Sequence, residues 1–273
     1  MGSAAINAGG EASRIDARVS YAIGQAAQRT GVDFDYLWNQ ARVESSLDPA
    51  AKAKTSSAAG LYQFIEQSWL GTVKKHGAEH GYAAAADSIR RRADGRYVVA
   101  DGQTRREILA LRYDADASAA MAAEFASDNA DYLAPRIGRE PNSTDLYFAH
   151  FLGAAGASRF LRAADAAPDA AAAASFPREA AANRSIFYTR GGEPRSFAQV
   201  YALMGRKLGA AAAPAAPVDF QPAPSAIPTR WAGIGGTADD PLGGMLSRPA
   251  DMLRPSPQSA RLAYMLVVSS LDA

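Results

Sequence analysis

The sequence predicts an all-α protein: one mainly helical globular domain followed by a disordered, Pro/Ala-rich C-terminal tail. Apolar residues recur at three- and four-residue spacing in most segments up to about residue 205. Hydrophobic residues make up 48% of the 273 residues, and many of them are alanine, which favours helices. Nine of the 15 prolines lie between Pro214 and Pro257, where an ordered core cannot form.

The helices follow from this spacing and from residues that begin or end them. In the first, Ile15, Val19, Ala22 and Ile23 share a face, and Gly31 ends it. Asp33 or Asp35 can cap the second, which ends near Asp48-Pro49. The helices are expected over residues 15–29, 33–44, 66–76, 105–113, 117–133, 143–152, 157–163 and 196–205.

The remaining segments complete the expected organisation. Tyr97 to Val99 lies between two glycines and suggests a small hairpin or a loop. We expect a flexible N-terminus over 1–14, one domain over 15–208, a Pro/Ala/Gly-rich linker or tail over 209–258 and a short helix over 259–273.

Composition excludes several classes of function. With 29 basic and 28 acidic residues the net charge is +1, which gives no reason to expect nucleic acid as a partner. The absence of cysteine excludes disulfides and thiolate zinc sites. No apolar run is long enough to span a membrane, and no signal peptide is visible in the first ten residues. We expect a monomer.

The most informative region contains Glu44. This carboxyl group is expected at the C-terminal end of a largely apolar helix, where the helix dipole and the loss of water both disfavour a negative charge. A general acid must hold its proton in this way. The opposing interpretation is an ordinary solvated glutamate, and the residue types alone do not exclude it. Gln63, after the turn at Gly60, supplies an amide suited to a sugar hydroxyl or N-acetyl group.

Three motifs in this order resemble the soluble lytic transglycosylase (SLT) family. Glu44-Ser45 with Asp48-Pro49 matches its Glu-Ser and Asn/Asp-Pro pattern, and Gly60-Leu61-Tyr62-Gln63 is similar to its Gly-Leu-Met-Gln. Ala149-His150-Phe151-Leu152-Gly153 stands where the family commonly has Ala-Tyr-Asn-x-Gly. The resemblance covers roughly residues 15–205.

The resemblance implies a fold like that of goose-type lysozyme and cleavage of the MurNAc–GlcNAc β-1,4 bond of peptidoglycan, with a 1,6-anhydroMurNAc product. It implies that Glu44 is the single catalytic acid and base, and that Ser45, Tyr62 and Gln63 contact the substrate. It also implies a place in the periplasm or cell envelope, and no cofactor. Tyr62 replaces the family's Met, Ser57-Ala58 replaces Gly-Ala, and the late Tyr-Val motif has no counterpart. These departures indicate a divergent branch resembling phage- and flagellum-associated members.

The motifs contain no second carboxylate of the kind that hydrolytic glycosidases use. Asp48 precedes a proline and is expected to cap the following turn. Substrate assistance by the N-acetyl group of MurNAc is therefore expected. The resemblance implies that Glu44 first protonates the leaving oxygen and then accepts the proton of the C6 hydroxyl.

A second wall of the site is expected on the helix with Tyr147, His150 and Phe151, which share one face at spacing i, i+3, i+4. These side chains suit stacking on sugars. The alternative is that Tyr147 and Phe151 fill the core and that a backbone carbonyl satisfies His150.

Weaker patterns are set aside. The two histidines His76 and His80, with Glu79 between them, could suggest a metal site. Glycines 77 and 81 interrupt the helix that would align the imidazoles, and no third ligand is evident, so we expect no metal. Asp114 and Asp116 are interpreted as helix caps rather than calcium ligands. Arg90-Arg91-Arg92 is interpreted as a solvated face or loop.

Two other functions stay open. A hydrolytic muramidase would share the fold and the substrate. A non-catalytic scaffold would use the domain to bind glycan, with the tail docking on a secretion or flagellar assembly partner.

Overall fold

A computed structural model describes residues 3–54 and 56–209, and this part of the chain is mainly helical, as predicted. Within it, the elements of the first half are α1 (Ser3–Thr30), α2 (Phe34–Ser45), α3 (Glu66–His76), the 3-10 helix η1 (Gly77–His80), α4 (Ala83–Ser88), β1 (Ile89–Arg91), β2 (Tyr97–Val99), α5 (Gly102–Ala110) and η2 (Leu111–Tyr113). Those of the second half are α6 (Ala115–Ile137), α7 (Ser143–Ala166), α8 (Ala172–Ser175), α9 (Pro177–Ala182), α10 (Arg184–Phe187) and α11 (Phe197–Leu208).

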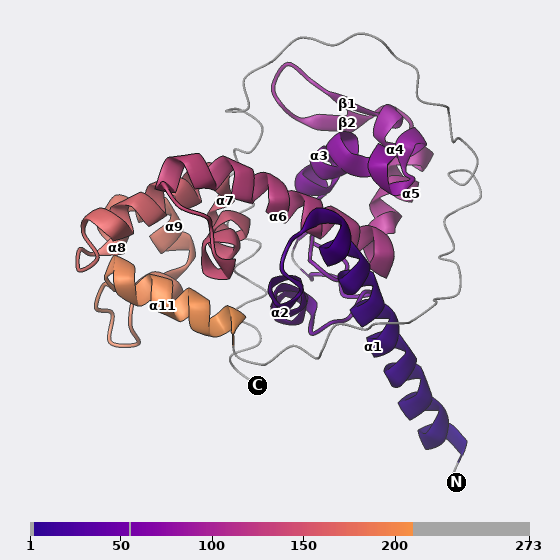
Figure 1. Cartoon of the computed structure of the whole chain (residues 1–273), viewed down its shortest axis with the longest axis horizontal. Helices are drawn as coiled ribbons and strands as arrows, with labels where there is room; N and C mark the ends of the chain where they lie inside the picture. Colours follow the sequence, from indigo (N-terminus) through magenta and orange to yellow (C-terminus); the bar gives the residue numbers. More distant parts are fainter. Residues whose placement is uncertain (1–2, 55, 210–273) are drawn as a thin grey trace.

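Helix α6 connects the two ends of the domain (Figure 1). It packs against α1 on one side and α7 on the other, while α11 packs against α7 and α2. Helices α8, α9 and α11 lie at the opposite end from α3, α4, α5 and the hairpin. This arrangement brings α2 and α11 together, although α11 begins at Phe197, 152 positions after α2 ends at Ser45.

Side-chain caps set several helix ends where the sequence predicts them. Asp33 accepts from the backbone N–H of Tyr36 at 2.7 Å and so begins α2. Asp114 accepts from the N–H of Ala117 at 2.9 Å and begins α6. Its predicted role as a cap is therefore confirmed by the hydrogen bond. Asp116, also expected to be a cap, lies inside α6 in its first turn.

Helix α1 is longer than expected. It begins at Ser3, so residues 3–14, which we expected in a flexible N-terminus, are helical. Ala and Glu residues of high helix propensity offset the two adjacent glycines of this segment. The predicted tail and C-terminal helix, residues 210–273, lie outside the described residues.

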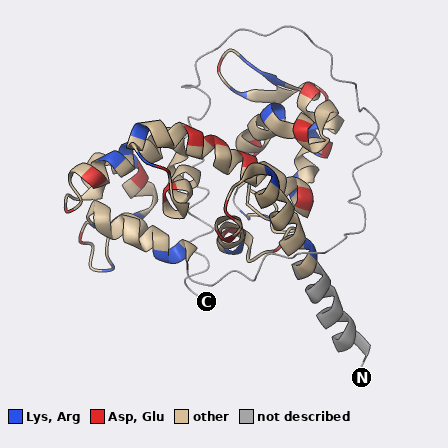
Figure 2. Ribbon diagram, viewed as in Figure 1, with Lys and Arg blue, Asp and Glu red and all other residues tan. Residues whose placement is uncertain are grey.

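Other bounds also differ from expectation. The helices expected over 105–113, 117–133 and 196–205 are α5, α6 and α11 with the bounds given above, and the short helices α4, α8, α9 and α10 were not expected. The helices expected over 143–152 and 157–163 form one element, α7, interrupted by a kink at Gly153, whose φ of 71° and ψ of 157° are not helical. Glycine is suited to this conformation because it has no Cβ. The expected hairpin exists, and its second strand pairs with β1 in antiparallel register. The basic run 90–92 therefore lies partly in a strand, where the hairpin is coloured blue in Figure 2. The side chains of these three residues are exposed.

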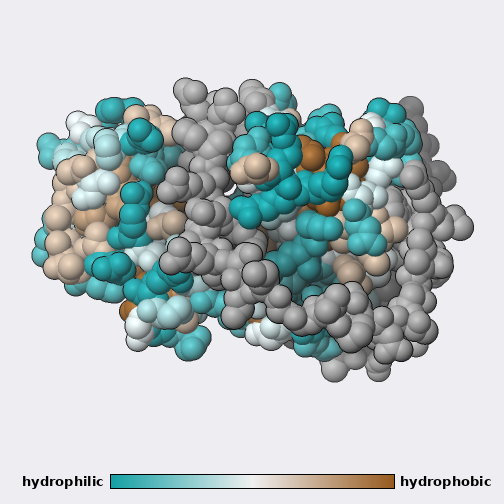
Figure 3. All heavy atoms as spheres, turned by 90° about the horizontal axis from the view of Figure 1, so that it is seen from above, coloured by the Kyte–Doolittle hydropathy of each residue, from teal (hydrophilic) through white to brown (hydrophobic). Residues whose placement is uncertain are grey.

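The core is built from aromatic and alanine side chains. At the α7–α11 end, the rings of Phe148 and Phe160 stack with centroids 4.3 Å apart, and Phe160 meets Phe197 edge-on at 5.0 Å. At the other end, buried Trp69 donates from Nε1 to the carbonyl of Ile108 at 2.8 Å. The visible surface mixes hydrophilic residues with small apolar areas (Figure 3). None of the helices in the described part of the chain has the length and apolar character needed to cross a bilayer.

Candidate functional site

Glu44 lies in the last turn of α2 and points into the protein. Its side chain is 1% exposed. Neither carboxylate oxygen has a hydrogen-bond partner among the residues that the structure describes. A buried carboxyl group without such partners is energetically costly, and proteins retain this arrangement mainly where function requires it.

The chain directly after Glu44 is strained. Ser46 caps α2 in the left-handed conformation with φ of 56°, and Leu47 follows with φ of 66°. For a non-glycine residue this conformation costs about 1–2 kcal/mol. Two such residues in succession turn the chain sharply into the loop that precedes Gly60. Strain of this kind is common at functional sites.

Ser45 joins α2 to that loop. Its hydroxyl lies 3.0 Å from the carbonyl of Ala41 and 2.8 Å from that of Leu61. The hydroxyl thus connects the Glu-Ser motif to the Gly-Leu-Tyr-Gln motif within the protein. The expected contact of Ser45 with substrate stays a prediction. Asp48, as expected, closes a turn by accepting from the N–H of Ala50 at 2.8 Å.

At Gly60 the loop lies against the backbone of Arg112. Its φ is +78°, and a Cβ at this position would lie 1.7 Å from the backbone oxygen of Arg112. The buried Arg112 guanidinium in turn donates to the carbonyls of Ser57, Phe64 and Leu109. This network fixes the loop, and with it Tyr62 and Gln63, against η2.

Tyr62 and Gln63 are both buried, at 1% and 5% exposure. The amide nitrogen of Gln63 donates to the carbonyls of Gly60 and Ala51, at 2.9 and 3.1 Å. The amide oxygen of Gln63 and the hydroxyl of Tyr62 have no hydrogen-bond partner in the described part of the chain. The Gln63 amide nitrogen, which we expected to bind a sugar, therefore donates to the loop backbone instead. The Gln63 amide oxygen and the Tyr62 hydroxyl are the nearby polar groups that such a ligand could still bind.

His150 approaches Glu44 from α7. Its Nε2 lies 3.0 Å from Oε1 of Glu44, although their relative orientation does not form a hydrogen bond. The ring of Tyr147 is nearly parallel to that of His150, with centroids 6.2 Å apart and an 8° angle between planes. The structure thus brings His150 and Glu44 together. Phe151 is buried in the hydrophobic core, and its expected contact with sugar stays a prediction.

Three further residues surround Glu44 that the sequence analysis missed. Tyr36 and Gln40 precede Glu44 on α2 by eight and four residues and are buried. The i, i+4, i+8 spacing places Tyr36, Gln40 and Glu44 on one ridge of the helix. This pattern could have revealed Tyr36 and Gln40. Lys207 comes from α11, and its proximity to Glu44 depends on the packing of α11 on α2, for which no local pattern exists.

The electrostatics reflect this grouping. Burial, and after it the charge of Glu44, raise the pKa values of the Tyr36 and Tyr147 hydroxyls far above the usual range. Burial lowers the pKa of the Lys207 ammonium, while Glu44 opposes that change. Both tyrosines therefore stay protonated at neutral pH and are potential donors toward charge at this point.

The chain matches no model of a known protein family. Among the residues that the structure describes, His150, Tyr36, Tyr147 and Lys207 interact with Glu44, and none of these four is a carboxylate. The site therefore combines one buried acid with an imidazole, two phenols and an amine.

Proposed function

We propose that this protein is a peptidoglycan lytic transglycosylase that cleaves the MurNAc–GlcNAc β-1,4 bond with Glu44 as its only acid and base. The observation that carries the proposal is a carboxyl group at 1% exposure that lacks a hydrogen bond within the described residues and faces an imidazole 3.0 Å away. The order of the three motifs around it, which resembles the SLT family, supplies the substrate class.

The first step requires Glu44 as an acid. The protonated carboxyl gives its proton to the glycosidic oxygen, and the C1–O4 bond breaks as the GlcNAc product leaves. The N-acetyl oxygen of MurNAc stabilises the positive charge that develops at C1, in the manner of substrate-assisted glycosidases. This assistance replaces the second carboxylate, which the interactions described for Glu44 do not include.

The second step returns the proton. The C6 hydroxyl of MurNAc attacks C1, its proton passes to the Glu44 carboxylate, and the 1,6-anhydro ring closes. No water is consumed, and the enzyme regains its starting protonation state. An acid that works in both directions benefits from a site that excludes water, because water would otherwise compete as the nucleophile.

His150 is placed to control the proton on Glu44. With Nε2 3.0 Å from Oε1, a small rotation of the imidazole would make a hydrogen bond to the carboxylate. We assign it a positioning role, in which it orients the carboxyl and stabilises its charged form between the two steps. Tyr36 and Tyr147 line the same site.

Substrate access follows from the same burial. Because the Glu44 side chain is 1% exposed, a glycan strand reaches it only when covering side chains move. His150, at 15% exposure, is one of these side chains. Peptidoglycan as substrate would place the protein in the periplasm or cell envelope.

The experiment adds the wild type or Glu44→Gln to suspensions of purified cell walls and measures the rate at which turbidity is lost. We expect the variant to lose at least ~10²-fold in rate, since it cannot donate or accept the proton. Glu140→Gln removes an exposed carboxylate of the same type and serves as the control. Equal activity of wild type and Glu44→Gln would refute the catalytic assignment. If the wild type, Glu44→Gln and Glu140→Gln all bind the cell walls and none of them reduces turbidity, the protein is instead a scaffold.

A further inference from the structure

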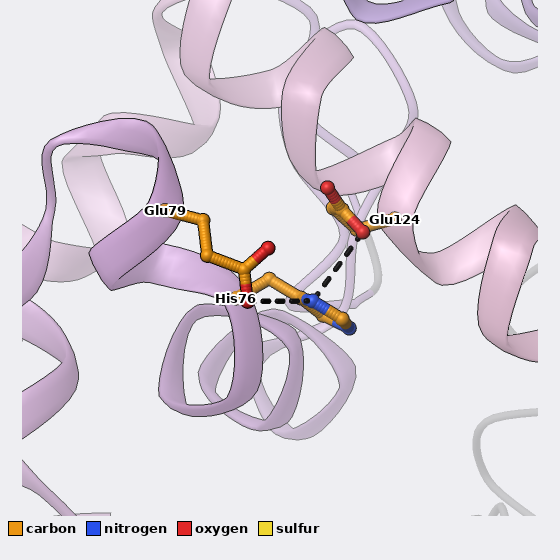
Figure 4. A group of neighbouring side chains, drawn as sticks. All are labelled: His76, Glu79 and Glu124. Carbon is orange, nitrogen blue, oxygen red and sulfur yellow. Dashed lines mark ion pairs between the residues drawn. The ribbon is translucent and has the colours of Figure 1, made fainter. Parts of the chain in front are cut away.

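A second cluster of titratable side chains lies away from Glu44, between α3 and α6. His76 ends α3, Glu79 belongs to η1, and Glu124 projects from the middle of α6. Figure 4 shows the imidazole of His76 between the two carboxylates, which approach the same ring nitrogen. This third ligand has no local signal in the sequence, because Glu124 is 44 residues from His80 along the chain.

The three side chains offer a nitrogen and two oxygens at the spacing of a metal site. Nδ1 of His76 lies 3.3 Å from Oε2 of Glu124 and 3.8 Å from Oε1 of Glu79. All three potential ligand atoms lie within 4.8 Å of one another. In a tetrahedral zinc site with bonds of about 2.0–2.1 Å, ligand atoms are separated by about 3.3 Å. Small side-chain rotations therefore suffice, and Glu79, at 66% exposure, is free of tight packing.

The other nitrogen of His76 is already engaged. Nε2 lies 3.1 Å from Oδ2 of Asp128, and Lys75 pairs with the same carboxylate. A proton on Nε2 that is donated to Asp128 leaves the lone pair of Nδ1 directed at the two glutamates. Nδ1 is buried and makes no hydrogen bond within the described residues. This carboxylate–histidine arrangement is the one that typically supports a metal-binding imidazole.

Glu124 is oriented in a similar way. His80 Nε2 lies 2.7 Å from Oε1 of Glu124, and the His80 side chain is 5% exposed. That contact holds one carboxylate oxygen and leaves the other facing His76. Two of the three potential ligands thus have a second group that fixes their direction.

The two carboxylates favour a cation at Nδ1. Oxygens of Glu79 and Glu124 lie 3.8 and 3.3 Å from this nitrogen. A divalent ion between the three side chains would balance the two negative charges that the glutamates carry.

We propose that His76, Glu79 and Glu124 bind a divalent transition-metal ion of the zinc type, with Asp128 and His80 orienting the ligands. A mixed set of imidazole and carboxylates suits Zn²⁺ or Co²⁺ better than Mg²⁺ or Ca²⁺, which prefer oxygen ligands alone. The ion would join the end of α3 and η1 to α6. The site is independent of the function proposed for Glu44.

Titration of the full chain with ZnCl₂ and CoCl₂ tests this proposal. We expect one equivalent to bind, a visible absorption band for Co²⁺, and a rise of at least about 5 °C in Tm at Zn²⁺ concentrations about 100 times the Kd. MgCl₂ at the same concentration should leave Tm unchanged. Failure of Zn²⁺ and Co²⁺ to bind at micromolar concentration would overturn the proposal and leave His76 as a proton-carrying member of an ion-pair network.

Variants locate the ion. The chain has three histidines, so His76→Gln is matched by His150→Gln, which removes the imidazole beside Glu44. We expect His76→Gln and Glu124→Gln to weaken Zn²⁺ binding at least tenfold and His150→Gln to leave it unchanged. Each variant is checked for an unchanged far-UV circular dichroism spectrum. Loss of binding in His150→Gln, but not in His76→Gln, would place the ion in the Glu44 site and contradict the proposal.

Discussion

Replacing Gly60 by alanine tests how the loop of the Glu44 site is held. The left-handed φ of +78° costs an alanine about 1–2 kcal/mol by itself. Its Cβ would also lie 1.7 Å from the oxygen and 2.6 Å from the carbon of the Arg112 carbonyl, which belong to the backbone and cannot rotate away. The loop must therefore move away from Arg112.

The cost of that movement can be worked from the contacts. The Arg112 guanidinium donates to Ser57 and Phe64 in the loop, and one hydrogen bond to a charged group contributes about 1.5–3 kcal/mol. Losing one of them together with the conformational cost gives a destabilisation of at least about 2.5 kcal/mol. Gly138→Ala provides the control, because Gly138 has φ of +73° and open space around its Cβ position. It should lose only about 1–2 kcal/mol.

Urea unfolding followed by circular dichroism measures both free energies of unfolding. The difference between the two variants isolates the contact with Arg112 from the cost of the left-handed backbone. Equal losses for Gly60→Ala and Gly138→Ala would refute the account of the loop. If the loop also positions the site, Gly60→Ala should lose cell-wall activity under conditions where it remains folded.

Three further predictions concern the same site. Tyr62→Phe should keep or raise stability at neutral pH, because the buried hydroxyl has no partner among the described residues; a loss above about 1 kcal/mol in urea unfolding would contradict this. Burial raises the pKa values of Tyr36, Tyr62 and Tyr147, so the unfolded chain loses these protons near pH 10 while the folded chain keeps them. The contribution of these tyrosines to the free energy of unfolding is therefore fully present below pH 10. Above pH 10 it falls by up to about 1.4 kcal/mol per pH unit for each tyrosine. A free energy of unfolding that does not change between pH 10 and 11 would contradict this prediction. Ser45→Ala should cost about 1 kcal/mol through the lost contact to Leu61, and no change in urea unfolding would count against that link.

Local chemistry made much of the fold predictable. Asp33 and Asp114 begin helices because their side chains satisfy backbone N–H groups within three residues, and such contacts depend on the sequence alone. The bounds of α3 were predicted correctly for the same kind of reason, since its apolar spacing and flanking residues are local. Helix α1 was predicted too short because its first residues lack the apolar spacing that the prediction used.

The surroundings of Glu44 were only partly predictable. His150 could be named because a motif marks it, but its 3.0 Å distance from Glu44 results from the packing of α7. Lys207 carries no local signal, since α11 meets α2 through long-range packing such as the hydrogen bond from Arg42 to the carbonyl of Leu208. Glu124 was overlooked as a partner of His76 for the same reason.

The most direct test of the proposed function is the mass of the soluble products. Cell walls digested by the wild type should release muropeptides that weigh one water less than hydrolysed ones, because the C6 hydroxyl of MurNAc closes the ring while Glu44 takes its proton. Glu44→Gln should release none. Products that carry only reducing MurNAc ends would contradict the account and identify a hydrolytic muramidase.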